Sequence, residues 1–193
     1  MLTRKTTPVP KTKQRIADAS LTLFVTQGIA ETTTRDIARE AGIAEGTIYR
    51  HFASKEDIAR DLFLENFLPF CAALKSIQGK DEPMIDRLGQ MVAQFYQAYD
   101  AQPELWIYVM TYQTGPRAKV PDDTPTPYRI MCELLDEATS KGEISDLDAP
   151  LYAQILLGMI EQPAAGFVCG EMDGALTPRV PDVVAAMERV LNL

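Results

Sequence analysis

Histidine and cysteine are scarce in this chain of 193 residues, and their scarcity excludes several kinds of site. His51 is the only histidine, and the three cysteines, at positions 71, 132 and 169, are isolated from one another. Structural zinc sites and disulfide frameworks need such residues at close, regular spacing, so we expect neither. We expect no metal and no cofactor. Isolated cysteines also fit a reducing compartment, so we expect a cytoplasmic protein.

The motifs of common enzyme classes are absent as well. The chain has no Gly-rich phosphate loop, no HExxH and no GxSxG sequence. A single histidine cannot be paired with a recognisable nucleophile. The pair Asp122-Asp123 lies in a proline-rich segment, where acidic residues are usually solvated. We therefore expect no enzyme activity and no catalytic residue.

No hydrophobic run is long enough to cross a membrane. The most apolar run, residues 151–160, is too short and too interrupted, since a spanning helix needs about 20 apolar residues. The N-terminus is basic but has no apolar segment of the signal-peptide type. We therefore expect a globular protein with no membrane partner.

Negative charge dominates the chain, whose formal net charge is −8, and this by itself argues against nucleic acid as a partner. The distribution of the charge reverses that interpretation. Residues 1–55 carry nine Lys or Arg and five Asp or Glu, a balance of +4, so the rest of the chain carries −12. A basic N-terminal part indicates a local DNA contact, and the acidic remainder limits non-specific binding.

Helical signals begin near the N-terminus. Apolar residues recur at helical spacing over residues 12–27, and Gly28 ends this predicted helix. Thr33 and Asp36 have the spacing of a capping box, so a second helix begins there. Gly42 can adopt the positive φ that ends this helix and turns the chain.

A short segment after this turn has the pattern of a recognition helix. Within residues 46–52, the buried types Ile48 and Phe52 alternate with polar groups that can meet DNA. Ser54 and Asp57 then start another helix, as N-cap and box partner. A short helix after a glycine turn, with its polar side chains outward, is how a recognition helix enters the major groove.

The order and spacing of these residues match a known family. The matching residues are Ile16, Ala19, Leu23, Phe24, Gly28, Thr32, Thr33, Arg35, Asp36, Ile37, Ala38, Ala41, Gly42, Gly46, Thr47, Ile48, Tyr49, His51, Phe52, Ser54 and Lys55. On these residues the first third of the chain resembles the DNA-binding domain of TetR-family transcriptional regulators. The family usually has Ser or Thr where Ala44 stands. Ala44 cannot accept a hydrogen bond, so we expect one helix cap and one phosphate contact to be missing.

The resemblance implies an all-α protein with an N-terminal three-helix DNA-binding domain, which contains the helix-turn-helix, and a helical C-terminal domain for ligand binding and dimerisation. We expect these domains at 1–55 and 56–193. Residues 1–11 are expected to be a flexible arm, either a solvated tail or a source of further DNA contacts.

The function implied by the resemblance is that of a homodimeric transcriptional regulator. We expect a repressor on a palindromic, double-stranded operator, released by an unidentified small apolar effector. Two alternatives stay open: a DNA-binding dimer without an effector, and a helical ligand carrier or enzyme with a vestigial DNA-binding part.

Ten residues are expected to bind DNA. Arg50 faces outward and reads a guanine or binds a phosphate. Tyr49 and His51 are expected on phosphates, which position the helix without reading sequence. Others lie at helix starts, whose amide groups favour anions. The full set is Thr33, Thr34, Arg35, Glu45, Gly46, Thr47, Tyr49, Arg50, His51 and Lys55.

Further helices are predicted near 55–77, 84–101, 104–114, 126–141, 148–170 and 179–191. The least helical segment, 115–127, is a loop that can gate a site. The helix at 148–170 is apolar on more than one face and is expected to kink at Pro163. It is either a purely internal core helix or, as the resemblance implies, a helix that also contacts a second subunit.

Aromatic and methionine residues recur at helical spacing in the C-terminal part. They are either plain core or the lining of an apolar effector pocket with a few polar groups. The candidates for ligand binding are Tyr96, Trp106, Met110, Gln113, Met131 and Gln162. Nothing in the sequence identifies the ligand.

Overall fold

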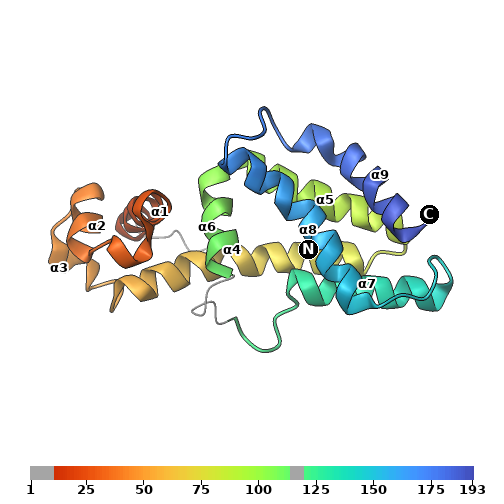
Figure 1. Ribbon diagram of the computed structural model, residues 1–193. Helices are drawn as coiled ribbons and strands as arrows, with labels where there is room; N and C mark the ends of the chain where they lie inside the picture. Colours follow the sequence, from red (N-terminus) through yellow and green to blue (C-terminus); the bar gives the residue numbers. More distant parts are fainter. Residues whose placement is uncertain (1–10, 114–119) are drawn as a thin grey trace. The chain divides into compact units, whose positions relative to one another are not determined.

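The computed structural model describes residues 11–113 and 120–193, and the regular structure within these ranges is helical (Figure 1). The all-α prediction is confirmed, and the helices predicted after residue 54 agree closely with those observed. Residues 1–10 of the predicted arm and 115–119 of the predicted gating loop lie outside the described residues. The helices are α1 (Lys11–Glu31), α2 (Thr34–Glu40), α3 (Glu45–Ile48), α4 (Lys55–Gln78), α5 (Met84–Ala101), α6 (Pro103–Gln113), α7 (Pro127–Lys141), α8 (Ala149–Val168), the short 3₁₀ helix η1 (Thr177–Arg179) and α9 (Val180–Leu191).

The described residues divide into two compact units. The head unit comprises residues 11–66 and 107–113, and the body unit comprises residues 67–106 and 120–193. The helices α4 and α6 therefore each contribute residues to both units. Across the described ranges, no helix combines the length and the apolar character that a bilayer crossing needs.

The first three helices of the head unit share a small apolar core. Ile16 of α1, Ile37 of α2 and Ile48 of α3 are all fully buried. The first helix differs from the prediction at its end. Gly28 has the non-helical backbone expected there (φ 83°, ψ 158°), but one more turn follows and α1 continues to Glu31.

The C-terminal half of α6 belongs to the same unit and packs there through aromatic rings. Tyr108 stacks on Phe24 of α1, with ring centroids 5.9 Å apart, and its hydroxyl donates to the carbonyl oxygen of Ala59 in α4 at 2.6 Å. Tyr112, one turn further, lies 4.8 Å from the ring of Phe63. These contacts join α6 to α1 and α4 within the head unit.

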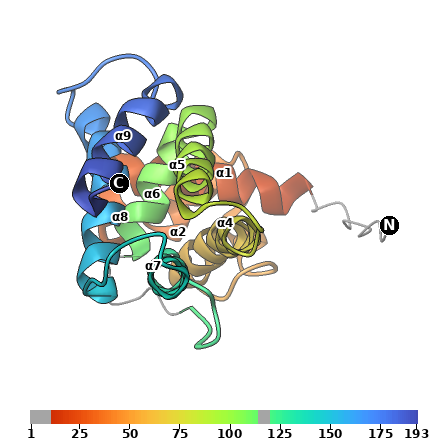
Figure 2. The same ribbon diagram turned by 90° about the vertical axis from the view of Figure 1, so that its right-hand side faces the viewer.

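In the body unit α7 packs on α8 and α5 packs on α9 (Figure 2). Asp148 caps α8 by accepting a hydrogen bond from the N–H of Leu151, as its position before the helix predicts. The helix α8 continues through Pro163 to Val168. Gly142 ends α7 in the left-handed conformation, with φ 73°.

An aromatic cluster of Phe70, Phe95 and Trp106 lies in the body unit. The ring centroids are 4.6 Å apart for Phe70 and Trp106, 5.9 Å for Phe95 and Trp106, and 6.1 Å for Phe70 and Phe95. All three pairs meet edge to face, the geometry that aromatic quadrupoles favour. The cluster brings together α4, α5 and the first half of α6.

Candidate DNA-binding surface

Hydrogen bonds fix both the start of α2 and the turn between α2 and α3. Thr33 and Asp36 form the predicted capping box: the Thr33 hydroxyl accepts from the N–H of Asp36 at 3.1 Å, and the Asp36 carboxylate accepts from the N–H of Thr33 at 3.2 Å. Gly42 turns the chain with φ 63°. The Arg15 guanidinium donates to the carbonyl oxygens of Ala41 and Gly42 and so ties α1 to the turn. The sequence did not reveal this role of Arg15, because its partners are 26 and 27 residues away.

Electrostatics support the start of α2. The pKa of Asp36 is lowered, first by the hydrogen bond from the Thr33 hydroxyl, then by that from the Thr33 N–H, with a smaller effect of Arg39. Asp36 is therefore ionised at neutral pH. A negative charge in the first turn also interacts favourably with the helix dipole.

The short helix α3, the predicted recognition helix, begins without a side-chain cap. Ala44 is its N-cap residue and makes no side-chain hydrogen bond, so the predicted absence of a cap is confirmed. The helix is only one turn long and is anchored by Ile48, which is fully buried. The N–H groups of His51 and Phe52 donate to the Ile48 carbonyl oxygen at 2.8 and 2.9 Å and continue the chain as a tight turn.

Side chains from α2 and α3 meet at the outer face of this junction. The Thr34 hydroxyl donates to the Glu45 carboxylate at 3.0 Å and lies 3.1 Å from the Tyr49 hydroxyl. Arg35 Nε lies 3.7 Å from the other oxygen of Glu45. Four of the expected DNA-binding residues are therefore brought together although up to 15 positions separate them in the sequence.

Other expected residues, within α3 and just after it, reach solvent. Arg50 and His51 are exposed, and Arg50 Nη2 donates to the Thr47 hydroxyl at 3.2 Å. Tyr49 is 55% exposed. Gly46 is exposed too, and apart from its chain neighbours and its own helix backbone no described atom lies within 4 Å of the position that a Cβ would take there. The surface of α3 is therefore open to the close approach of a duplex.

Lys55 differs from the others in the direction of its side chain. Its ammonium donates to the carbonyl oxygens of Ala30 and Thr32, at 2.8 and 2.7 Å. It therefore ties the start of α4 to the connection between α1 and α2. A phosphate contact of Lys55 stays a prediction, because a phosphate would have to compete with these two carbonyl groups.

The six expected ligand-binding residues are divided between the two units of the chain. Tyr96, Trp106 and Met131 are buried in the body unit. Met110 and Gln113 belong to the head unit instead, on the second half of α6. Burial raises the pKa of Tyr96 to about 12, and its hydroxyl has no hydrogen-bond partner among the described residues.

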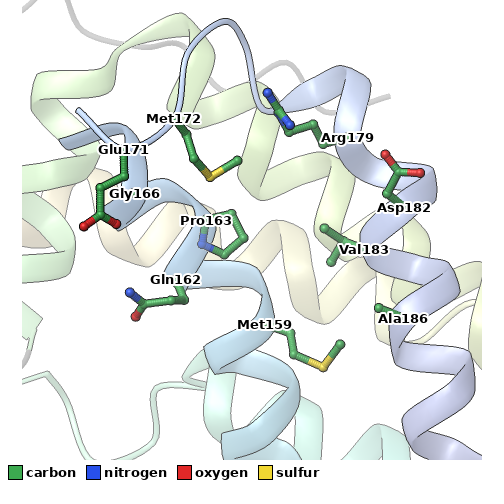
Figure 3. A pocket seen from close by; sticks show the side chains of 10 residues that line it. All are labelled: Met159, Gln162, Pro163, Gly166, Glu171, Met172, Arg179, Asp182, Val183 and Ala186. Atoms are coloured by element: carbon green, nitrogen blue, oxygen red, sulfur yellow. The ribbon is translucent and has the colours of Figure 1, made fainter. Parts of the chain in front are cut away.

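Gln162, the sixth candidate, lines an open groove between α8 and α9 (Figure 3). The groove has a volume of about 540 Å³. Most of its lining is apolar, and three charged residues, Glu171, Arg179 and Asp182, contribute to it. It is lined by Met159, Gln162, Pro163, Gly166, Glu171, Met172, Arg179, Asp182, Val183 and Ala186.

Residues 11–113 and 120–193 hold no group of three or more His, Cys, Asp or Glu side chains with the arrangement of metal ligands. At the α2–α3 junction, hydroxyl, guanidinium and carboxylate groups come together on one surface. Hydroxyl and guanidinium groups are the usual donors to DNA phosphates and base edges. The geometry therefore favours nucleic-acid recognition at the α2–α3 pair.

Comparison with known proteins agrees with this geometry. The family model of bacterial regulatory proteins of the tetR family matches residues 16–62. The chain is 30% identical over 148 residues to the HTH-type transcriptional repressor KstR2 of Mycobacterium tuberculosis (strain H37Rv), covering 73% of this chain and 74% of that repressor. It is 26% identical over 189 residues to the fatty acid metabolism regulator protein of Bacillus subtilis (strain 168), covering 95% and 93% of the two chains.

A similar fold occurs in the crystal structure of the regulator FadR from Bacillus subtilis in complex with stearoyl-CoA. The TM-score is 0.71 and the identity 21%, over 90% of this chain and 96% of that one. Because the repressor KstR2 is 30% identical over about three quarters of both chains, the comparison reaches well beyond the helix-turn-helix. The chain belongs to the TetR family of transcriptional regulators.

Proposed function

We propose that this chain is a repressor that binds a palindromic operator as a homodimer and leaves it when a small apolar ligand binds. The observation that carries the DNA-binding part is the meeting of Thr34, Arg35 and Tyr49 at the α2–α3 junction, beside the exposed Arg50. In this proposal α3 enters the major groove. Arg50 reads a guanine there, and the Tyr49 and His51 side chains bind phosphates.

Apolar surface on the body unit supports the dimer. Leu151 and Ile155 of α8 are large hydrophobic residues that are 53% and 39% exposed. Met159, four residues after Ile155 on α8, lines the groove of Figure 3 between α8 and α9. A second copy of the chain would cover both, and its symmetry would present two copies of α3 to two half-sites one helical turn, or a multiple of it, apart.

We further propose that the apolar part of the effector is a long acyl chain, carried as an acyl-CoA. The regulator named for fatty acid metabolism is similar to this chain along almost its whole length, and FadR shares its fold and binds stearoyl-CoA. The rings of Phe70, Phe95 and Trp106 offer apolar surface to an acyl chain, which would enter by separating them. The unpartnered hydroxyl of Tyr96 is a donor for the thioester carbonyl group.

The helix α6 is the proposed link between ligand and DNA. Its first half, with Trp106, belongs to the body unit, and its second half, with Tyr108 and Tyr112, belongs to the head unit. A ligand that moves Trp106 therefore acts on a helix that is held against α1 and α4 by Tyr108 and Tyr112. Linkage requires the effect to be reciprocal, so operator DNA must weaken ligand binding by the same factor.

The test has two stages. Selection from a random duplex library identifies the operator, and fluorescence anisotropy then measures its affinity with stearoyl-CoA, with free stearate and with CoA alone. We expect a palindromic sequence to be enriched and its affinity to fall with stearoyl-CoA only. Enrichment of a sequence that no ligand weakens would favour a dimer without an effector of this class. A library from which no sequence is enriched would contradict the proposal as a whole.

A further inference from the structure

Three polar side chains at the α2–α3 junction form a hydrogen-bond chain with a fixed direction. Thr34 Oγ1 lies 3.0 Å from Glu45 Oε1 and 3.1 Å from Tyr49 Oη. An ionised carboxylate can only accept, so the single hydroxyl hydrogen of Thr34 is donated to Glu45. Thr34 can then only accept from Tyr49. The chain therefore runs from Tyr49 through Thr34 to Glu45.

This direction decides which groups are available to DNA. Phosphate oxygens accept hydrogen bonds, and a hydroxyl has one hydrogen to donate. In the observed arrangement the Thr34 hydrogen is donated to Glu45 and the Tyr49 hydrogen to Thr34, and the Glu45 carboxylate also neutralises part of the charge of Arg35, whose Nε is 3.7 Å away. Three phosphate-binding groups are thus engaged by one carboxylate.

Resting on the proposed function, we propose that Glu45 is a specificity-determining switch of the DNA-binding surface. On the operator, the exocyclic amino group of a cytosine replaces Thr34 as the partner of Glu45, since a Glu carboxylate is a suitable acceptor for cytosine N4 in the major groove. The released hydroxyls of Thr34 and Tyr49 then turn to phosphates. Where no cytosine is within reach, Glu45 keeps its partners and its charge repels the duplex.

The position of Glu45 suits this role. It is the first residue of α3, and its side chain is 39% exposed. Ala44 before it offers no hydroxyl that could bind the same phosphates, and Gly46 after it leaves open space for a base edge. Recognition of a base and binding of phosphates are therefore linked through one side chain, which lowers the affinity for duplexes that lack the base.

The experiment compares the full-length wild type with Glu45→Gln and Thr34→Val in selection from a random duplex library, followed by affinities for the selected and for a random duplex at several salt concentrations. Glu45→Gln keeps the shape and an acceptor for Thr34 but removes the charge. We expect it to lose a cytosine preference at one position of each half-site. We also expect several-fold tighter binding to the random duplex and a steeper salt dependence, by a slope of about one.

Thr34→Val is the matched control, because it removes the central hydroxyl and leaves the Glu45 charge. It should weaken the selected duplex, on which Thr34 binds a phosphate, change the affinity for the random duplex little, and keep the cytosine preference. Thermal unfolding followed by circular dichroism checks that both variants fold as the wild type does.

The inference is overturned if Glu45→Gln keeps every base preference of the wild type and its affinity for the random duplex. It is also overturned if the base preference that depends on Glu45 is for adenine. The partner of Glu45 would then be the amino group of adenine and not that of cytosine. A wild type that enriches no sequence would instead contradict the proposed function. The two failures are therefore distinguishable.

Discussion

The Arg87 guanidinium is completely buried, and its Nη1 donates to both carboxylate oxygens of Glu137 at 3.1 Å. The same nitrogen donates to the carbonyl oxygen of Gln78 at 2.7 Å. Arg87 thus joins the end of α4, the start of α5 and the last turns of α7. Its Nε and Nη2 have no hydrogen-bond partner among the described residues, and the nearest other carboxylate, that of Glu143, is 3.9 Å away. Glu137 is therefore the main partner that compensates the buried positive charge of Arg87.

We expect Glu137→Ala to lower the free energy of unfolding by about 3 kcal/mol, because it leaves the buried charge of Arg87 without its main partner. Glu133→Ala on the same helix is the control. Glu133 pairs with Lys75 at the surface, where such a pair contributes below about 1 kcal/mol. Urea unfolding measures both variants. If both variants lost the same free energy of unfolding, Glu137 would not be the partner that compensates the charge of Arg87.

The same carboxylate makes stability depend on pH. The pKa of Glu137 is lowered, first by the hydrogen bond from Lys141 and then by that from Arg87. Since the folded-state pKa lies below the usual value of 4.5, the stabilisation is complete above pH 4.5 and is lost as the pH falls through the folded-state pKa. We expect the difference in urea midpoint between the wild type and Glu137→Gln to shrink from pH 5 downward. If the difference in urea midpoint stayed constant down to pH 3, the charge of Glu137 would not be its cause.

Arg50→Ala and Tyr49→Phe should change DNA binding in different ways. Loss of Arg50 should remove about 1–3 kcal/mol of discrimination at one base pair of each half-site. Loss of the Tyr49 hydroxyl should weaken all duplexes alike, because a phosphate contact carries no sequence information. Affinities for the operator and for its single-base variants, measured at one salt concentration, separate the two effects. If Arg50→Ala keeps every base preference, Arg50 binds only a phosphate.

The proposed dimer is tested by a charge on α8. Gly158 is exposed, with no described atom within 4 Å of its Cβ position, so Gly158→Arg fits the monomer without a clash. Buried against a second subunit, an unpaired charge costs several kcal/mol, and we expect a monomer with unchanged helical content. Ser140→Arg, on an exposed position of α7, should leave the dimer intact. Sedimentation velocity distinguishes these results, and a dimeric Gly158→Arg protein would place the interface elsewhere.

Tyr96→Phe separates ligand binding from core packing. The Tyr96 hydroxyl is buried and has no hydrogen-bond partner within residues 11–113 and 120–193, so its removal should leave the free energy of unfolding unchanged or raise it. If it donates to the thioester, the affinity for stearoyl-CoA should fall by up to about tenfold. Tyr99→Phe is the control, since the Tyr99 hydroxyl donates to the Ala164 carbonyl oxygen at 3.4 Å. That variant should lose stability but keep its affinity for the ligand.

Local signals explain why most of the fold could be predicted. Thr33 with Asp36, and Asp148 before α8, mark helix starts within four residues of sequence, and both are observed as caps. The partners of Thr34 lie 11 and 15 residues away, and no local pattern pairs them. Arg87 gave no signal either, because its burial arises from the meeting of three helices.

Lys55 illustrates the same distinction. Its place at the start of α4 predicts a group near an anion. Its observed partners are the carbonyl oxygens of Ala30 and Thr32, which only the folded chain brings within reach. Residue type and helix position predict a DNA contact for Lys55, but they gave no sign of the two carbonyl partners that the tertiary structure supplies.

The sharing of α6 between two units limits how this regulator can be recombined with others. A chimaera that takes residues 1–66 from this chain and its remaining residues from another regulator would leave Tyr108 and Tyr112 behind. Phe24, Ala59 and Phe63 would then face foreign side chains. A transplant of operator specificity should therefore carry residues 107–113 with it, or exchange only the surface residues of α2 and α3.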